Sequence, residues 1–368
     1  MKIGYQGTFI LFLLVLYAIA LYRGYAAGRE QHSLITQMKT FGGYVFYFPF
    51  LWFLRKKKNQ SMIWKALLIL ACIGALVYIL KGYFLKGEEV YIRETTGVRV
   101  ATRQPNAYAM ILLMYVGRIW KNWKNRPPLI LLIVPVVIIG SSILLSQTRG
   151  IWGGVLLALA AAWILNLFRK KDSVKLGRKL VTSLTALAVL VILVVFAISA
   201  SGILSVSNIA KRTGPEGGSY ITETSTLARL VAWSAVLDEL RGPAMITGKG
   251  FGALYTCFRP DHGMVITVYY VDSAYFQIAL NMGVIGVVVL LGIFISGLIR
   301  SAGIFLRTSS NVRAGIALGM FCAIIMLLFA GGFAAVLTNY RFTVLWALLL
   351  AMVQTEYIRE RNESSSVA

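Results

Sequence analysis

The stretch of sequence from residue 128 to residue 168 reads PLILLIVPVVIIGSSILLSQTRGIWGGVLLALAAAWILNLF. It holds two apolar runs, each close to the roughly 20 residues that an α-helix needs to cross a bilayer. Residues 146–150 (SQTRG) form a short polar break between them. Because backbone groups find no water in the hydrocarbon core, such runs must be helical. The stretch therefore predicts two membrane-spanning helices joined by a tight turn.

Similar apolar runs recur along the whole chain. Its 368 residues are 58% hydrophobic and only 14% charged, with a mean hydropathy of +0.73. This composition excludes an ordinary water-soluble domain. We predict an all-α fold, a polytopic transmembrane helix bundle with about ten spans. The predicted helices cover residues 8–24, 38–54, 62–85, 104–119, 128–147, 150–168, 180–204, 272–299, 314–336 and 341–357.

The net charge of +23 comes from short basic clusters between the apolar runs. Lys and Arg beside spans mark cytoplasmic loops, so the excess charge requires no nucleic-acid partner. Alternate loops hold more than half of the 37 basic residues, and the opposite loops hold most of the 14 acids. We predict cytoplasmic N- and C-termini. The chain then divides into seven N-terminal helices (1–204), an extracytoplasmic loop (205–271), and three C-terminal helices with a cytoplasmic tail (272–368).

The extracytoplasmic loop is the longest polar stretch of the sequence. Within it, residues 225–240 (STLARLVAWSAVLDEL) place apolar side chains at helical spacing, which predicts a short helix against the membrane face. Glycine-rich turns at 213–218 and 248–252 flank this helix. The second turn, GKGFG, lacks the Lys-Ser/Thr pair of a nucleotide phosphate loop. We therefore expect backbone to pack against backbone there.

Arginines on the outward side are the first candidate binding residues. Arg149 lies in the turn between the two helices of the opening stretch, and Arg229 lies on the loop helix, one turn before Trp233. A guanidinium at the membrane border can bind phosphate oxygens through two parallel hydrogen bonds. The alternatives are an arginine that extends to the lipid headgroups and a solvated charge on a loop helix. Further outward cations that could attract a lipid diphosphate are Arg99, Arg103 and Arg341.

Asp272 stands where the loop enters an apolar helix. The helix dipole favours a carboxylate at that point, so capping is one explanation. The other is a general base that removes a proton from a sugar hydroxyl, which requires a carboxylate or an imidazole within hydrogen-bond reach. His262 is the reserve candidate for that base. Tyr269, Tyr270 and Trp233 offer flat surfaces to sugar rings, although aromatic residues are also common at membrane interfaces for other reasons.

These residues, in this order, resemble the O-antigen ligase and polymerase family of bacterial membrane glycosyltransferases. The resemblance extends from about residue 95 to residue 300. The pieces that carry it are RVATRQPN at 99–106, SQTRGIW at 146–152, Arg229 with Trp233, TGKGFG at 247–252, and Asp272-Ser273 with Gly283 and Gly286.

One position departs from the ligase branch of this family. Ligases carry a His followed by Asn, Ser or Gln, then nine residues, a Gly, two residues and a second Gly. This chain has the same spacing, with Asp272 in place of the His. An Asp at this point looks more like the polymerase branch, which lengthens undecaprenyl-diphosphate-linked glycans. The chain also has fewer predicted spans than usual members of the family.

The resemblance implies that Arg149 and Arg229 hold the diphosphate of a polyprenyl-linked donor and that Asp272 is the base. An acceptor sugar hydroxyl would displace the lipid diphosphate in a single inverting step on the outer face of a bacterial inner membrane. Because that leaving group is already activated, we expect no nucleotide, metal or other cofactor. The expected partners are the lipid-linked glycan donor, the glycan acceptor, the lipid bilayer and other polysaccharide-assembly proteins.

Two alternatives stay open. The first keeps the family and changes the acceptor to lipid A core or to a protein, as in O-antigen ligation. The second is a membrane transporter, which would place charged residues in the middle of spans and break helices in paired positions. The predicted spans carry such residues near helix ends, at Lys65 and Lys81, and this pattern disfavours transport.

Overall fold

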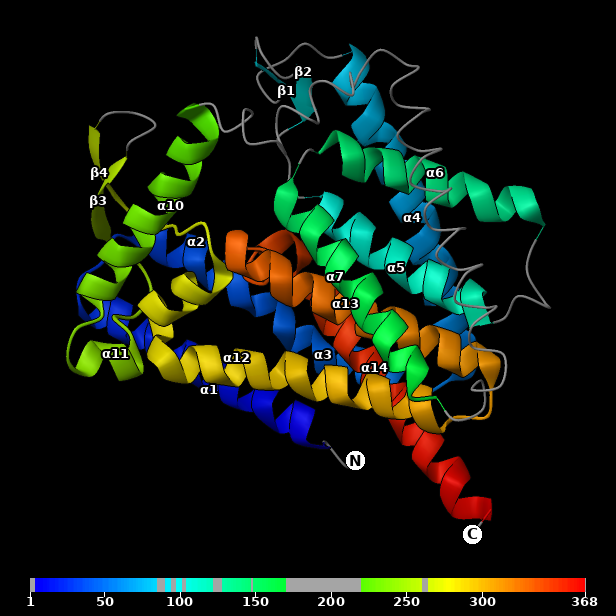
Figure 1. Ribbon diagram of the computed structural model, residues 1–368. Helices are drawn as coiled ribbons and strands as arrows, with labels where there is room; N and C mark the ends of the chain where they lie inside the picture. Colours follow the sequence, from blue (N-terminus) through cyan, green and yellow to red (C-terminus); the bar gives the residue numbers. More distant parts are fainter. Residues whose placement is uncertain are drawn as a thin grey trace. The chain divides into compact units, whose positions relative to one another are not determined.

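The computed structural model describes residues 4–84, 90–93, 97–100, 104–121, 128–146, 148–169, 220–259 and 264–367 (Figure 1). These residues are mostly helical, as predicted, and include two short β-hairpins. They pack as two compact units. The first unit contains Met1–Gln60, Gly218–Arg300 and Leu327–Ala368, and the second contains Ser61–Gly217 and Ser301–Met326.

Within the described residues, five helices are long and apolar enough to cross a membrane. They are α1 (Gly4–Ala26), α4 (Lys57–Phe84), α7 (Arg149–Leu167), α12 (Ala274–Arg307) and α13 (Asn311–Phe333). A shorter apolar segment, Ile133–Leu145, lies in α6 (Leu129–Leu145). The chain is therefore a helical integral membrane protein, whereas the total of about ten spans stays a prediction. The helix predicted over 180–204 lies outside the described residues.

The helix predicted over 38–54 is divided into three consecutive pieces. They are α2 (Gln31–Gly42), the 3-10 helix η1 (Gly43–Phe46) and α3 (Tyr47–Phe53). The division falls where η1 packs against α14 (Tyr340–Val367). A Cβ atom on Gly43 would lie 2.1 Å from Thr343 Oγ1, so only glycine permits this approach. The buried Tyr44 side chain strengthens the contact by donating a hydrogen bond to Leu337 O at 2.9 Å.

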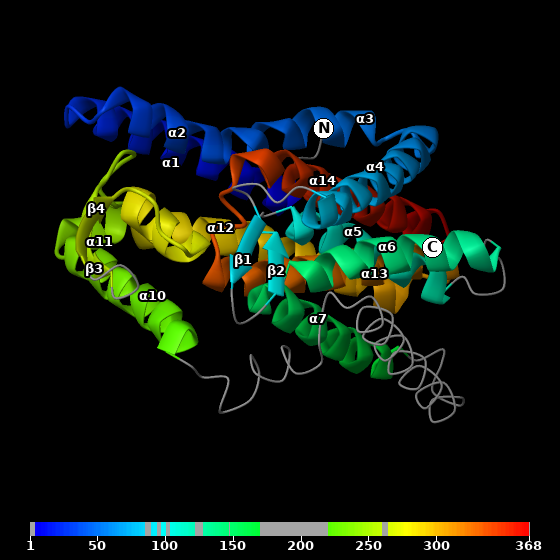
Figure 2. The ribbon, with the colours of Figure 1, turned by 90° about the horizontal axis from the view of Figure 1, so that it is seen from above.

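In the second unit, α5 (Pro105–Lys121) packs against both α6 and α7 (Figure 1). Glycines allow α5 to approach α13 closely, because a Cβ atom on Gly117 would lie 2.6 Å from Gly319 Cα. The predicted tight turn between α6 and α7 is present, and Trp152 Nε1 donates across it to Ile143 O at 3.1 Å. The hairpin of β1 (Val90–Arg93) and β2 (Gly97–Val100) belongs to the same unit (Figure 2).

In the first unit, α10 (Tyr220–Glu239) confirms the helix predicted over 225–240 and begins earlier. The short helix α11 (Pro243–Thr247) follows it. An antiparallel hairpin of β3 (Tyr255–Arg259) and β4 (Met264–Val268), which we did not predict, lies against α10 (Figure 1). A small apolar core joins these elements to α12 through Val236, Leu240, Ala253, Tyr255, Cys257, Val271 and Leu280.

Candidate functional site

The glycine-rich segment 248–252 packs into a break in α12. The break is at Gly283, whose backbone has φ 70° and ψ −169°. Lys249 N donates to Leu280 O at 2.8 Å, and Gly250 N donates to Asn281 O at 3.0 Å. A Cβ atom on Gly283 would lie 2.1 Å from Ile246 O, and one on Gly248 would lie 2.4 Å from Met282 N. We call residues 246–252 and 280–283 the glycine clasp. The predicted backbone-to-backbone packing of 248–252 is confirmed.

The N-terminal helices hold the clasp from the other side. Phe251 N donates to Ala20 O at 2.9 Å, and a Cβ atom on Gly24 would lie 2.3 Å from Phe251 O. The Phe251 ring is fully buried between Tyr17 and Phe41, with ring centroids 5.3 Å and 5.8 Å away. Segments more than 200 residues apart in the sequence therefore fix the backbone of this motif.

Two glutamines extend this framework to residues 269–271, which connect β4 to α12. Gln37 Oε1 accepts a hydrogen bond from Gly252 N at 2.7 Å, and Gln37 Nε2 donates to Tyr269 O at 2.9 Å. Gln277 Nε2 donates to the same carbonyl at 3.2 Å, and Gln277 Oε1 accepts from Val271 N at 2.8 Å. Both glutamine side chains are buried, so the backbone groups that they bind have little access to water and depend on these hydrogen bonds. The backbone of residues 269–271 is thus held firmly, directly before Asp272.

Asp272 is exposed and lies one residue outside the N-cap of α12. The N-cap position belongs to Ser273, because its carbonyl accepts the first hydrogen bond of the helix from Gln277 N at 3.0 Å. Ser273 is buried, and its hydroxyl points to Gly331 O at 3.5 Å. The arrangement therefore assigns the capping position to Ser273 and leaves the Asp272 carboxylate at the solvent-accessible entrance of the helix.

The Trp233 ring links α10 to the first turn of α12. It stacks on Phe276, with ring centroids 5.1 Å apart and an interplanar angle of 12°. One face of the indole is therefore covered by protein. Its Nε1 is buried and has no hydrogen-bond partner among the described residues. Arg229 is half-buried one helical turn earlier on α10, so the stack ties the arginine-bearing helix to the helix that begins beside Asp272.

A group of charged residues beside the glycine clasp was missed by sequence reasoning. Arg23 Nη1 donates to Thr247 O at 2.8 Å, and Arg29 Nη1 donates to Gly252 O at 2.9 Å. Lys249 forms an ion pair with Glu239 at the end of α10. Burial lowers the pKa of the Arg29 guanidinium, and nearby Arg23 lowers it further, whereas Glu239 raises it. Lys249 lies in the quoted motif, but nothing in the sequence places Arg23 or Arg29 beside it.

The remaining predicted residues fall into three groups. Arg341 is exposed at the start of α14 in the first unit, where its guanidinium lies 5.5 Å from the Tyr340 ring centroid. Arg149 is the first residue of α7, and Arg99 pairs with Tyr91 in the β1–β2 hairpin, both in the second unit. Arg103 and His262 lie outside the described residues. The first unit therefore contains Arg229, Trp233, Tyr269, Tyr270, Asp272 and Arg341.

Carboxylates, imidazoles and thiols do not gather into a metal site in the part of the chain that the structure describes. The site instead consists of an exposed carboxylate, a neighbouring helix with an arginine, and a rigid glycine framework. The fold and this site define a helical integral membrane protein with a candidate site beside the broken helix α12.

A family model described as O-antigen ligase matches residues 134–291 of this chain. The matched region begins in α6 and includes Arg149, α10, the glycine clasp and Asp272. A search of curated proteins returns no match. The predicted resemblance to the O-antigen ligase and polymerase family is confirmed over these residues. The match is consistent with membrane glycan transfer of the ligase or polymerase type.

Proposed function

We propose that this protein is a polysaccharide polymerase of the O-antigen, capsule or exopolysaccharide type. It transfers a glycan from an undecaprenyl-diphosphate-linked donor to a sugar hydroxyl on the outer face of the bacterial inner membrane. The observation that carries the proposal is the position of Asp272, an exposed carboxylate one residue outside α12 and next to a backbone held by Gln37 and Gln277. Such a carboxylate suits a general base.

The proposed reaction is one inverting displacement. The acceptor hydroxyl oxygen attacks the anomeric carbon of the donor while its proton passes to the Asp272 carboxylate. The bond from the anomeric carbon to the diphosphate oxygen breaks, and its electron pair leaves with the lipid diphosphate. Arg149 and Arg229 stabilise the growing negative charge, because guanidinium groups bind phosphate oxygens strongly at sites of low dielectric constant. Neither a nucleotide nor a metal takes part in this scheme.

The other predicted residues have binding roles in this proposal. Further outward cations attract the charged donor, and aromatic side chains contact sugar rings. The cations are Arg99, Arg103 and Arg341, and the other contact residues are Trp233, Tyr269, Tyr270 and His262. The stack of Trp233 on Phe276 supports a role for one face of the indole only.

Arginine variants test the proposal directly. Arg149→Ala and Arg229→Ala should each abolish glycan chain extension in membranes while protein levels stay normal, because each removes a group that binds the leaving diphosphate. Lysine at the same positions should restore part of the activity, since it keeps the charge and loses the planar fork.

Arg241→Ala is the matched control for Arg229→Ala. Arg241 lies just after the end of α10, but its side chain is 81% exposed and pairs with Asp238. Exposed ion pairs of this kind contribute about 0–1 kcal/mol, so this variant should extend glycans normally. Full activity in both Arg149→Ala and Arg229→Ala would remove the diphosphate role.

Ligation is the second candidate function, because the matching family model is described as O-antigen ligase. A deletion strain separates the two. Glycans of a single repeat unit indicate a lost polymerase. Long glycans that stay on the carrier lipid indicate a lost ligase.

A further inference from the structure

Arg300, near the end of α12, is a buried cation with neutral neighbours. Arg300 is 8% exposed. Nη1 donates to Gln6 Oε1 at 2.9 Å and also to Gln354 Oε1. The guanidinium carbon lies 5.3 Å from the centroid of the Tyr357 ring. Among the described residues, the groups that hydrogen-bond to Arg300 or stack on it are therefore uncharged.

The same cluster has more hydrogen-bond donors than acceptors. Arginine has only N–H groups, so both glutamines must turn their oxygens toward it and their Nε2 groups away. Gln6 Nε2 is buried and has no partner among the described residues, and the same is true of the Tyr47 hydroxyl. Gln6 and Tyr47 are both fully buried, and Tyr47 lies within electrostatic range of Arg300. Burying a donor without a partner is unfavourable, so the surplus donors require an acceptor.

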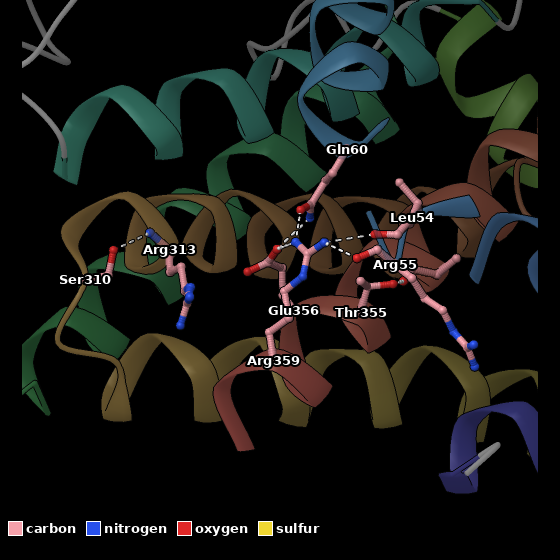
Figure 3. Close-up of polar contacts among 9 residues, drawn as sticks. Leu54, Arg55, Gln60, Ser310, Arg313, Thr355, Glu356 and Arg359 are labelled. Carbon is pink, nitrogen blue, oxygen red and sulfur yellow. Dashed lines mark hydrogen bonds and ion pairs between the residues drawn. The ribbon is translucent and has the colours of Figure 1, made fainter. Parts of the chain in front are cut away.

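A second arginine, Arg359 on α14, shows what a complete cluster looks like (Figure 3). Its Nη1 bonds to Glu356 Oε1 at 2.8 Å and to Gln60, and its Nη2 donates to Leu54 O at 2.9 Å and to Arg55 O at 3.0 Å. Gln60 Nε2 donates to Glu356 Oε1 at 2.6 Å. The Glu356 carboxylate therefore balances the charge of Arg359 and accepts from both neighbours.

The Arg300 cluster has the cation and the amides of the Arg359 cluster, but it has no counterpart of Glu356 among the described residues that contact it. A buried charge without a counter-charge is far more costly than a buried neutral group. A buried water molecule could accept hydrogen bonds, but it could not balance the charge. An anion would do both.

We propose that Arg300, Gln6, Tyr47 and Gln354 form a binding site for one small inorganic anion such as chloride. The four residues are 0–8% exposed, so the ligand must be small. They come from α1, α3, α12 and α14, so a bound anion fastens four helical elements of the first unit together. Because such a ligand binds only the folded chain, it stabilises the protein in proportion to its occupancy.

The test is the thermal stability of the purified full-length protein in detergent micelles. Sodium chloride is exchanged for sodium gluconate at constant ionic strength, and the midpoint Tm is measured. Wild-type protein should melt several degrees higher in chloride, with a saturable dependence on chloride concentration. An identical Tm in both salts would overturn the proposal, and so would stabilisation by phosphate or phosphatidylglycerol alone.

Variants separate the anion site from general stability. Tyr47→Phe keeps the ring and removes one donor, so it should fold and should raise the chloride concentration needed for half of the shift by about tenfold. The matched control is Gln60→Leu in the Arg359 cluster, which should lower Tm equally in both salts. A normal chloride response in Tyr47→Phe, or a lost response in Gln60→Leu, would contradict the assignment. None of these residues belongs to the proposed transfer site, so the result is independent of the proposed reaction.

Discussion

Asp272 before α12 and Arg300 near its end differ in exposure, in partners and in what holds them. Asp272 is exposed and follows a backbone that two buried glutamines fix in place. Arg300 is 8% exposed, and glutamine side chains contact its own guanidinium. At the start of α12 the glutamines bind the backbone and leave the Asp272 carboxylate accessible. Near the end of α12 the glutamines bind the Arg300 guanidinium itself, which is buried.

This difference separates two uses of a charge in a membrane protein. An accessible carboxylate keeps its solvation and can exchange a proton with a substrate. A buried guanidinium has little access to water, and the protein must compensate its charge locally. Changes at the start of α12 should therefore affect turnover, and changes at its end should affect stability. The predictions below test whether that separation holds.

Asp272→Asn should have the largest effect on turnover. The amide keeps the shape of the side chain but cannot take a proton, so glycan transfer should fall by about 10²–10⁴-fold. Tm should stay unchanged, because Ser273 occupies the N-cap. The measurements are chain extension in isolated membranes and Tm in micelles. Asp272→Glu is the control, since it retains a carboxylate and should keep partial activity. Wild-type turnover in the Asn variant would return Asp272 to a structural role.

Gly283→Ala should have the next largest effect, on stability. The residue has a φ of 70°, and an added Cβ would lie 2.1 Å from Ile246 O, so strain and overlap together should cost about 3 kcal/mol or more. Gly303→Ala in the same helix is the control, because a Cβ there meets nothing within 4 Å. It should leave stability equal or raise it by about 0.5–1 kcal/mol. Equal losses of stability in the two variants would show that the glycine clasp does not require a glycine at position 283.

Hydropathy and motif order carried much of the fold and the family, and the reasons are physical. Long apolar runs must be helical in lipid, so α1, α4, α7, α12 and α13 follow from composition. The backbone packing of 248–252 followed from glycine content. The family resemblance followed from five motif pieces, of which the piece at 99–106 lies before the region that the family model matches and the others lie inside it.

Other features depend on partners that are remote in the sequence. The contact of η1 with Thr343 divides a helix that hydropathy predicts as continuous. In the β3–β4 hairpin, exposed residues alternate with buried ones in β3 and with half-buried ones in β4, and the packing of this hairpin against α10 is set by residues remote in the sequence. Gln37 and Gln277 look ordinary in the sequence, and only their shared contact with Tyr269 O reveals their positioning role. The roles of Asp272, Arg149 and Arg229 stay predictions.

Tyr357→Leu should have the smallest effect and probes the far end of α12. It removes the ring that faces the Arg300 guanidinium at 5.3 Å, and such a contact contributes about 0.5–2 kcal/mol. Tyr357→Phe keeps the ring and should be almost neutral, so the difference in Tm between the two variants isolates the cation–π contact. Glycan transfer at a temperature well below Tm should be normal in both. If the leucine variant instead lost transfer at an unchanged Tm, the two ends of α12 would be coupled in turnover. The role of the buried Arg300 could then not be limited to stability.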